Sequence, residues 1–229
     1  MDPVLGHTTP FTTKLDEVPE PLPSLDAIRS GSNLALPPEE QRLNHFLTPQ
    51  ELPAALERSS TLLAPRPSPD DSYLDPDLVA ASQERHDQAV EAVRRIVALG
   101  NGSSADRSRS NKQMCIEVFG RHNTDSQLPA DPGVHTPAAT GKTPRAGPDT
   151  GSSEVQAAIL TVKIRVLAKE LQQSGNKDKH NKRNLRLMVH RRQKLLKYLK
   201  RKEKGGVRYR NVMEALGLDD AAIEKELFL

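Results

Sequence analysis

The sequence predicts an all-α fold in which a four-helix core follows an extended, partly helical N-terminal arm. Apolar residues recur at helical spacing through the C-terminal third of the 229 residues. Aromatic residues make up 3% of the chain and tryptophan is absent, which disfavours a large β-rich or α/β core. The 18 prolines and a mean hydropathy of −0.62 indicate that much of the chain cannot bury a dense core. The single cysteine excludes an internal disulfide framework.

Residues 1–37 are expected to form an extended arm. Prolines at positions 3, 10, 19, 21 and 23 fix φ and disfavour helix in the residues before them. Leu22, Leu25 and Ile28 are interpreted as residues that pack on the surface of a neighbouring molecule rather than in a hydrophobic core of this segment. The first residues are typical of neither a secretory signal nor an Arg-rich presequence, so the chain is either already processed or carries no such leader.

Short helices are expected along the rest of the arm. Pro37-Pro38-Glu39-Glu40 is typical of a helix entry, and a second helix is predicted from Thr48-Pro49-Gln50-Glu51 to about Leu63. Asp75-Pro76-Asp77 opens a third helix, in which apolar residues continue at helical spacing until Gly100. Residues 1–103 are therefore assigned to an N-terminal extension.

The core is predicted to begin with a helix over residues 104–119, which ends at Gly120. Residues 123–148 are rich in Pro, Gly, Thr and Ala and show no periodicity. A structureless segment of this length is uncommon inside a compact domain, so it is interpreted as an inserted loop.

Three further helices are expected to complete the core, over residues 153–173, 179–204 and 207–216. The first is apolar on two adjacent stripes, which predicts packing partners on two sides. The second has one apolar and one basic face, and Gly205-Gly206 turns the chain into the third. At about 1.5–3 kcal/mol per fully buried aliphatic side chain, these helices can hold together. Residues 219–229 are assigned to a C-terminal tail.

Positive charge is concentrated between Lys163 and Arg210. This segment holds 18 Lys or Arg residues against three acidic ones, a net charge of +15, whereas the whole chain carries +3. The rest of the chain therefore sums to −12. A field of this density on a helical hairpin indicates a polyanion-binding surface rather than an ordinary solvated helix face.

Short motifs follow one another in this half of the chain: Asp-Thr-Gly-Ser at 149–152, Glu154-Val155-Gln156, Asp178-Lys179-His180, Arg191-Arg192 with Leu195-Leu196-Lys197-Tyr198-Leu199, and Arg208-Tyr209-Arg210 before Leu216-Gly217. Together they resemble small-subunit ribosomal protein fifteen of the bacterial and organellar type, over residues 104–122 and 149–218. The resemblance implies a four-helix protein that binds small-subunit ribosomal RNA, supports assembly of its central domain and lies near the contact with the large subunit.

The resemblance also implies an RNA-binding set of residues, which suits recognition of an RNA junction by shape and through its wide minor groove. The positions that match contacts to a three-way junction are Thr150, Gly151, Gln156, Tyr198 and Arg201, with Lys163 nearby. The positions expected at a second RNA site are Asp178, His180 and Asn181. The basic face adds Arg191, Arg192 and Lys194.

Two of these residues have a structural interpretation beside the functional one. Gln156 with Ser153 fits a capping box, and Asp178 fits a helix N-cap. The chain also departs from the family pattern, because Glu170 stands where His is usual, Asn181 stands where Ser is usual, and the loop before Asp178 is one residue longer. A carboxylate at position 170 would repel phosphate, so the junction contacts are expected to be the stronger ones.

Enzymatic activity and metal binding are not expected. Gly141-Lys142-Thr143 resembles the end of a phosphate-binding loop, but Thr136 stands where the first Gly is required, and no strand is predicted before it. The seven His residues form no i,i+4 pair and have no Cys partner for a metal. Neither a cofactor nor a membrane span is predicted.

Two other functions stay open for the basic helix over residues 179–204. A DNA-binding helix-turn-helix would place base-reading residues in the first turns, whereas the densest charge lies mid-helix. A membrane- or calmodulin-binding helix would carry Trp or Phe anchors, which this helix lacks. The Pro-rich extension on a bacterial-type core favours a mitochondrial ribosome over the bacterial cytoplasm, with ribosomal RNA, neighbouring small-subunit proteins and the large subunit as partners.

Overall fold

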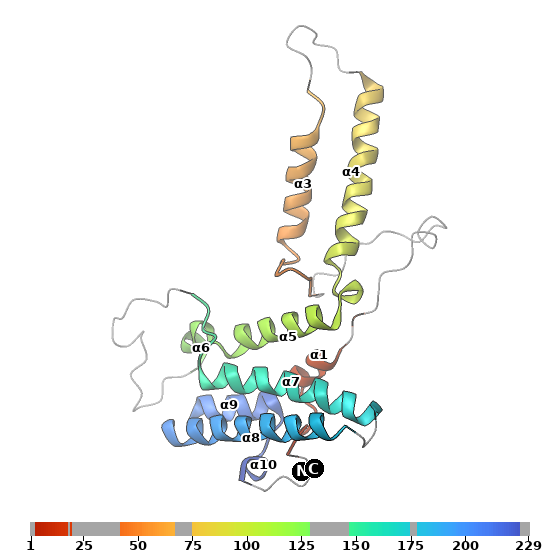
Figure 1. The fold of residues 1–229 in the computed structure, drawn as a ribbon. Helices are drawn as coiled ribbons and strands as arrows, with labels where there is room; N and C mark the ends of the chain where they lie inside the picture. Colours follow the sequence, from red (N-terminus) through yellow and green to blue (C-terminus); the bar gives the residue numbers. More distant parts are fainter. Residues whose placement is uncertain are drawn as a thin grey trace. The chain divides into compact units, whose positions relative to one another are not determined.

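The computed structural model describes residues 3–17, 19, 42–66, 75–128, 147–174 and 178–224. The regular structure within these residues is helical, apart from one isolated bridge between Leu43 and Ala98, which confirms the all-α prediction. The chain divides into two compact units (Figure 1). The core unit contains residues 1–17 and 111–229, and the arm unit contains residues 18–110.

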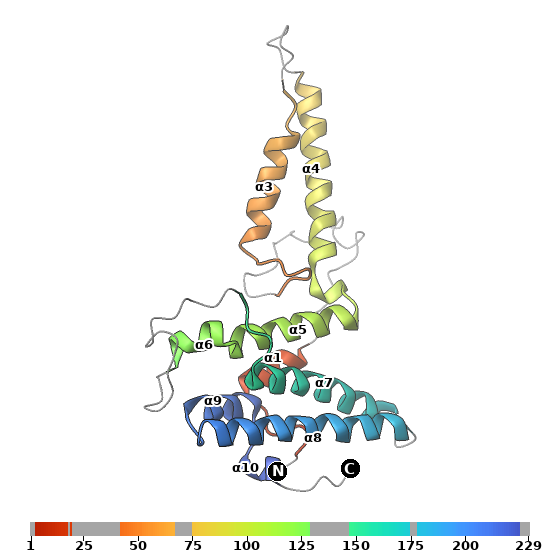
Figure 2. The same ribbon diagram turned by 60° about the vertical axis from the view of Figure 1, so that its left-hand side comes forward.

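A helical hairpin forms the centre of the core unit. Helix α7 (Ser153–Ser174) and helix α8 (Lys179–Lys202) run side by side in both views (Figures 1 and 2). Both stripes of α7 are covered, since Val155 and Ile164 are each fully buried. Val155 belongs to one buried apolar cluster and Ile164 to a second, and residues of α8 contribute to both clusters. Val166, at the end of one predicted stripe, is instead exposed.

Two short helices close this hairpin. Helix α9 (Val207–Leu216) buries Val212, Met213 and Leu216, as its apolar spacing predicted. Helix α10 (Asp220–Glu224) lies within the predicted C-terminal tail, so that part of the tail prediction is corrected. The physical reason is burial of Ala222 and Ile223, together with a hydrogen bond from the Gln193 amide to the Ala222 carbonyl at 2.9 Å.

Helix α5 (Ser104–Phe119) has the predicted bounds, and its Cys115 and Phe119 are buried in the core unit. Helix α6 (Arg121–Gln127) was not predicted, and its last five residues lie in the stretch that was interpreted as an inserted loop. The Thr124 hydroxyl and backbone N–H both donate to the Gly120 carbonyl, which stabilises this short helix. Residues 129–146 of the predicted loop lie outside the described residues.

The first residues of the chain differ most from expectation. They are not an extended arm but belong to the core unit, where helix α1 (Pro10–Asp16) begins with a capping box between Thr9 and Thr12. Leu15 is buried, and the Phe11 ring meets the Phe119 ring edge-on, with their centroids 5.1 Å apart. The predicted anchors Leu22, Leu25 and Ile28 and the predicted helix entry at 37–40 lie outside the described residues.

The arm unit contains the two longer helices that the sequence predicts for the extension. Helix α3 (Glu51–Leu63) and helix α4 (Pro76–Val97) are followed by a short 3-10 helix, η1 (Leu99–Asn101). Pro76 follows the N-cap Asp75, whose carboxylate accepts from the Asp77 N–H. Among the described residues of this unit, one buried apolar cluster joins Leu43, Leu52 and Val97.

Candidate RNA-binding surface

The loop that leads into α7 is organised by Asp149. Its carboxylate accepts from the backbone N–H groups of Gly151 at 3.1 Å, Ser152 at 3.2 Å and Arg121 at 3.3 Å. Burial opposes ionisation of Asp149, but these N–H donors outweigh it and hold the pKa of the carboxyl below its usual value. The ionised side chain thus fixes the backbone around Thr150 and Gly151, two of the predicted junction residues.

Arg121 lies behind this loop, and it was not among the site residues predicted from the sequence. Its guanidinium pairs with Glu154 at 3.0 Å and approaches Glu203 at 3.8 Å, and both carboxylates are buried. Burial lowers the pKa of Arg121, but Glu154, Glu203 and Asp149 together raise it above its ordinary value. Arg121 therefore ties the start of α6 to the start of α7 and the end of α8. The sequence pattern at Gly120 predicted only the end of a helix and gave no signal for the ion pairs of Arg121.

A pocket of about 350 Å³ lies where the start of α7 meets the end of α8. It is lined by Arg121, Asp149, Gly151, Ser152, Ser153, Leu195, Tyr198 and Lys202. The ammonium group of Lys202 lies 5.8 Å from the centroid of the Tyr198 ring, within the range of a cation–π contact. The structure thus brings Gly151 and Tyr198 together at one end of the hairpin, and it adds Lys202, which was not predicted from the sequence.

Gln156 has a local structural contact. Its side-chain amide donates to the Thr150 carbonyl at 2.6 Å, so it stabilises the loop before α7. This bond differs from the predicted capping box with Ser153, whose hydroxyl donates instead to Glu154. Gln156, Lys163 and Glu170 are seven residues apart and therefore lie along one side of α7.

The basic face of α8 is a continuous exposed stripe. Arg191, Lys194, Tyr198 and Arg201 follow one another at three- and four-residue spacing, and all four are exposed. Tyr198 is 46% exposed, although the same helix also carries a buried apolar face. The stripe presents three cations and one aromatic ring to a ligand.

Arg192 is a correction to the predicted RNA-binding set. The side chain is 1% exposed and points into the core unit. Its guanidinium donates to the carbonyl oxygens of Pro3 at 2.8 Å and Val4 at 2.9 Å, and to the Thr161 hydroxyl at 3.2 Å. The apolar spacing of α8 places residue 192 on the buried stripe, so this arginine stabilises the fold and does not reach a surface ligand.

The opposite end of the hairpin carries the second predicted group. The Asp178 carboxylate accepts from the Asn181 backbone N–H at 3.0 Å and from the Asn181 side-chain amide at 2.6 Å. Asp178 is therefore the N-cap of α8, as the structural interpretation of this residue proposed. His180 and Glu170 are exposed. Counted along α8 at about 1.5 Å per residue, this end lies roughly 30 Å from Tyr198.

The described residues were also compared with the requirements of a membrane-spanning helix and of a metal site. None of the described helices combines the length and the apolarity that crossing a bilayer requires. Within the same residues, His, Cys, Asp and Glu side chains form no group of three or more that could hold a metal ion.

Comparisons with known proteins identify relatives of this chain. Residues 139–219 match the family model described as Ribosomal protein S15. The whole chain is 39% identical to the small ribosomal subunit protein uS15m of Neurospora crassa and covers 75% of its length. The small ribosomal subunit protein uS15m of Schizosaccharomyces pombe is 32% identical over 60% of this chain, a match that spans 38% of that relative.

Proposed function

The chain belongs to the uS15m family of small ribosomal subunit proteins, and from that premise we propose that the end pocket and the basic stripe bind a helical junction of small-subunit ribosomal RNA. Family membership makes the protein a structural constituent of the small subunit of the mitochondrial ribosome, in the matrix, and not an enzyme. Ribosomal RNA and neighbouring ribosomal proteins are its partners.

One observation carries the proposal: the pocket joins the loop before α7 to the end of α8. Gly151, Tyr198 and Lys202 are brought together there from positions about 50 residues apart in the sequence. Side chains read A-form RNA through its shallow minor groove and 2′-hydroxyls, and they recognise junctions by shape. A loop held by Asp149 presents its backbone in one conformation, which lowers the entropy cost of binding.

The stripe on α8 supports the same assignment. Arg191, Lys194 and Arg201 supply charge for phosphates on both sides of an exposed tyrosine ring, which can stack on an unpaired base. Tyr198 belongs both to the stripe and to the lining of the pocket, so the two adjoin near the end of α8. We propose that this surface is the principal RNA contact and that it supports assembly of the central domain of the small subunit.

We expect a weaker contact at the Asp178 end. Asp178 and Asn181 bond to each other, and the carboxylate of Glu170 adds negative charge to the last turns of α7. A contact with the large subunit is a further part of the proposal, and it rests on the family resemblance alone.

A salt titration of RNA binding tests the proposal. The full chain is mixed with a fragment of small-subunit ribosomal RNA that contains the three-way junction, and its affinity is measured at several salt concentrations. Replacing Arg191, Lys194 and Arg201 with Ala should lower the slope of log affinity against log salt by about one for each phosphate that the variant no longer neutralises.

A control variant carries the same change of charge elsewhere. Arg58, Arg66 and Arg85 of the arm unit are also exposed, and replacing these three with Ala should leave the slope unchanged. Equal slopes for the two triple variants would contradict the proposal. The basic stripe would then neutralise no more phosphates than the arginines of the arm unit do.

A further inference from the structure

Residues Pro3–Asp16 are bound by the core helices through buried charge. The guanidinium of Arg192, which is itself 1% exposed, donates to the carbonyl oxygens of Pro3 and Val4. Val4 is buried in the same apolar cluster as Ile164 and Val189 of the hairpin. A buried charge is tolerated only where acceptors surround it, and the N-terminal backbone supplies two of them.

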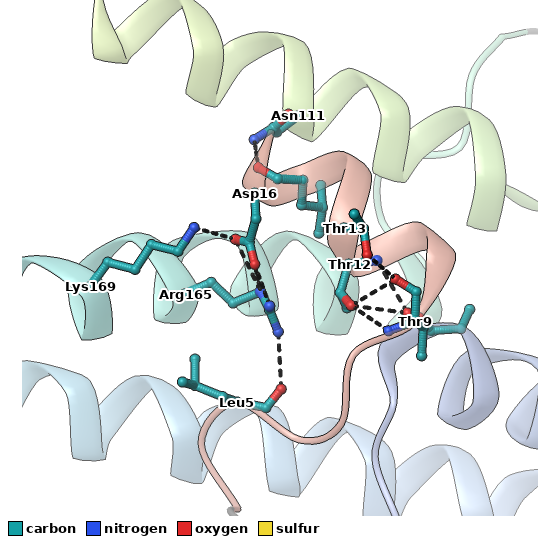
Figure 3. A network of polar contacts seen from close by, with 10 residues as sticks. Leu5, Thr9, Thr12, Thr13, Asp16, Asn111, Arg165 and Lys169 are labelled. Carbon is teal, nitrogen blue, oxygen red and sulfur yellow. Dashed lines mark hydrogen bonds and ion pairs between the residues drawn. The ribbon is translucent and has the colours of Figure 1, made fainter. Parts of the chain in front are cut away.

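A second arginine, Arg165, contacts the segment at Leu5 and at Asp16 (Figure 3). Arg165 of α7 donates to the Leu5 carbonyl at 3.0 Å and forms an ion pair with Asp16, which Lys169 also contacts at 2.9 Å. Burial opposes ionisation of Asp16, but Arg165 and Lys169 outweigh it and hold the pKa of the Asp16 carboxyl below its usual value. This cluster fixes the end of α1 against α7.

The segment also bonds to α5 and to the end of α9. The Asn111 amide donates to the Leu15 carbonyl at 3.0 Å, a bond drawn in Figure 3. The Thr9 hydroxyl donates to the Ala215 carbonyl at 2.6 Å, and the His7 N–H donates to the Gly217 carbonyl at 2.9 Å. Residues 3–16 therefore contact all four helices that the sequence assigned to the core.

Two glycines allow this close approach. Gly6 has a φ of 68° and Gly217 a φ of 66°, in the left-handed region that favours glycine. A Cβ atom at Gly6 would collide with the carbonyl oxygen of Gly217, and a Cβ at Gly217 would collide with that of His7. The two backbones are thus packed directly against each other.

We propose that residues 3–16 are kept in the mature protein as a structural part of the core, and that any proteolytic maturation during mitochondrial import ends upstream of Pro3. Cleavage within the segment would remove the carbonyl acceptors of Arg192 or the carboxylate that pairs with Arg165, and would leave cationic groups buried without them. This inference rests on the mitochondrial assignment and not on the RNA contact, so the two can fail separately.

The mature N-terminus can be measured directly. Small subunits are purified from mitochondria of cells that express the chain from its natural gene, and the N-terminal peptide is identified by mass spectrometry. The expected peptide begins at or before Pro3. A mature N-terminus anywhere from Val4 onward would overturn the proposal.

Limited proteolysis of the purified full chain tests the packing with a matched pair of variants. Gly6→Ala should speed tryptic cleavage after Lys14 by about tenfold or more, because it strains a left-handed residue and separates the segment from Gly217. Gly205→Ala is the control, since Gly205 also has a positive φ, 73°, but an added Cβ there meets no neighbour within 4 Å. Equal cleavage rates at Lys14 in the two variants would show that the segment is not held as proposed.

Discussion

The α7–α8 hairpin and the α3–α4 pair differ in how much of their apolar surface is buried. On α7 and α8, Val155, Val189 and Leu199 are fully buried. On α3 and α4, Leu52 and Val97 are buried, whereas four other large apolar side chains are 59–66% exposed, namely Leu62, Leu63, Leu78 and Ile96. Both pairs show helical periodicity in the sequence. Periodicity therefore predicts that a helix forms, but not that it closes a core.

The two units also differ in charge. Residues 18–110 carry nine arginines, no lysine and 14 acidic residues, a net charge of −5. The core unit carries the remaining +8, and its segment 163–210 alone carries +15. A surface of net negative charge is repelled by phosphate, so the arm unit is not expected to bind RNA. We expect its exposed apolar residues to pack against neighbouring ribosomal proteins.

The largest expected effect compares the two apolar cores. Leu196→Ala in the core unit should lower the free energy of unfolding by about 2–5 kcal/mol, because Leu196 is 1% exposed and its site cannot collapse fully. Leu52→Ala in the arm unit should leave the same transition unchanged. Chemical denaturation of the full chain, followed by circular dichroism, measures both. A similar loss in the two variants would show that the units unfold together.

The next effect separates two adjacent arginines. Arg192→Ala should lower the free energy of unfolding by about 1–3 kcal/mol, because it leaves the Pro3 and Val4 carbonyls without this donor. Arg191→Ala should change it by less than about 0.5 kcal/mol but should weaken RNA binding. Thermal unfolding and RNA affinity are measured on both variants. The assignment of Arg192 to the core is wrong if Arg191→Ala is the more destabilising.

The helices of the core could be predicted from the sequence almost to the residue. The predicted α8 ends at residue 204, and the observed one ends at Lys202. What could not be predicted were short elements that depend on tertiary contacts. Helix α1 begins at Pro10 in a stretch where prolines recur, and it is held by Arg165 and Asn111. Helix α10 is held by the burial of Ile223.

The candidate site was predicted less completely, for a different physical reason. Charge counting treats Arg191 and Arg192 alike, although Val189, Arg192, Leu196 and Leu199 share one helical stripe, so the burial of Arg192 could have been inferred. Arg121 could not have been found in this way. Its partner Glu154 lies 33 positions away along the chain, and only the folded structure brings them together.

The smallest expected effect concerns pH. The pKa of Asp149 is lowered in the folded core, so its ionised form contributes stability that is fully present above the unfolded value of about 3.8 and is lost as pH falls through the lower native pKa. The stability difference between wild type and Asp149→Asn should therefore shrink at the acid end of the range. Glu51→Gln in helix α3 of the arm unit is the control, and it should not alter the core transition at any pH. A difference that persists unchanged below the native pKa would exclude ionised Asp149 as its source.

Site-specific photo-crosslinking in purified small ribosomal subunits tests the central claim most directly. A photoreactive residue is placed at Tyr198 in the basic stripe or at Leu63 in the arm unit, and the crosslinked partner is identified as RNA or protein. We expect position 198 to crosslink to small-subunit ribosomal RNA and position 63 to crosslink to a ribosomal protein. Crosslinking of position 63 to RNA, with none from position 198, would contradict the claim.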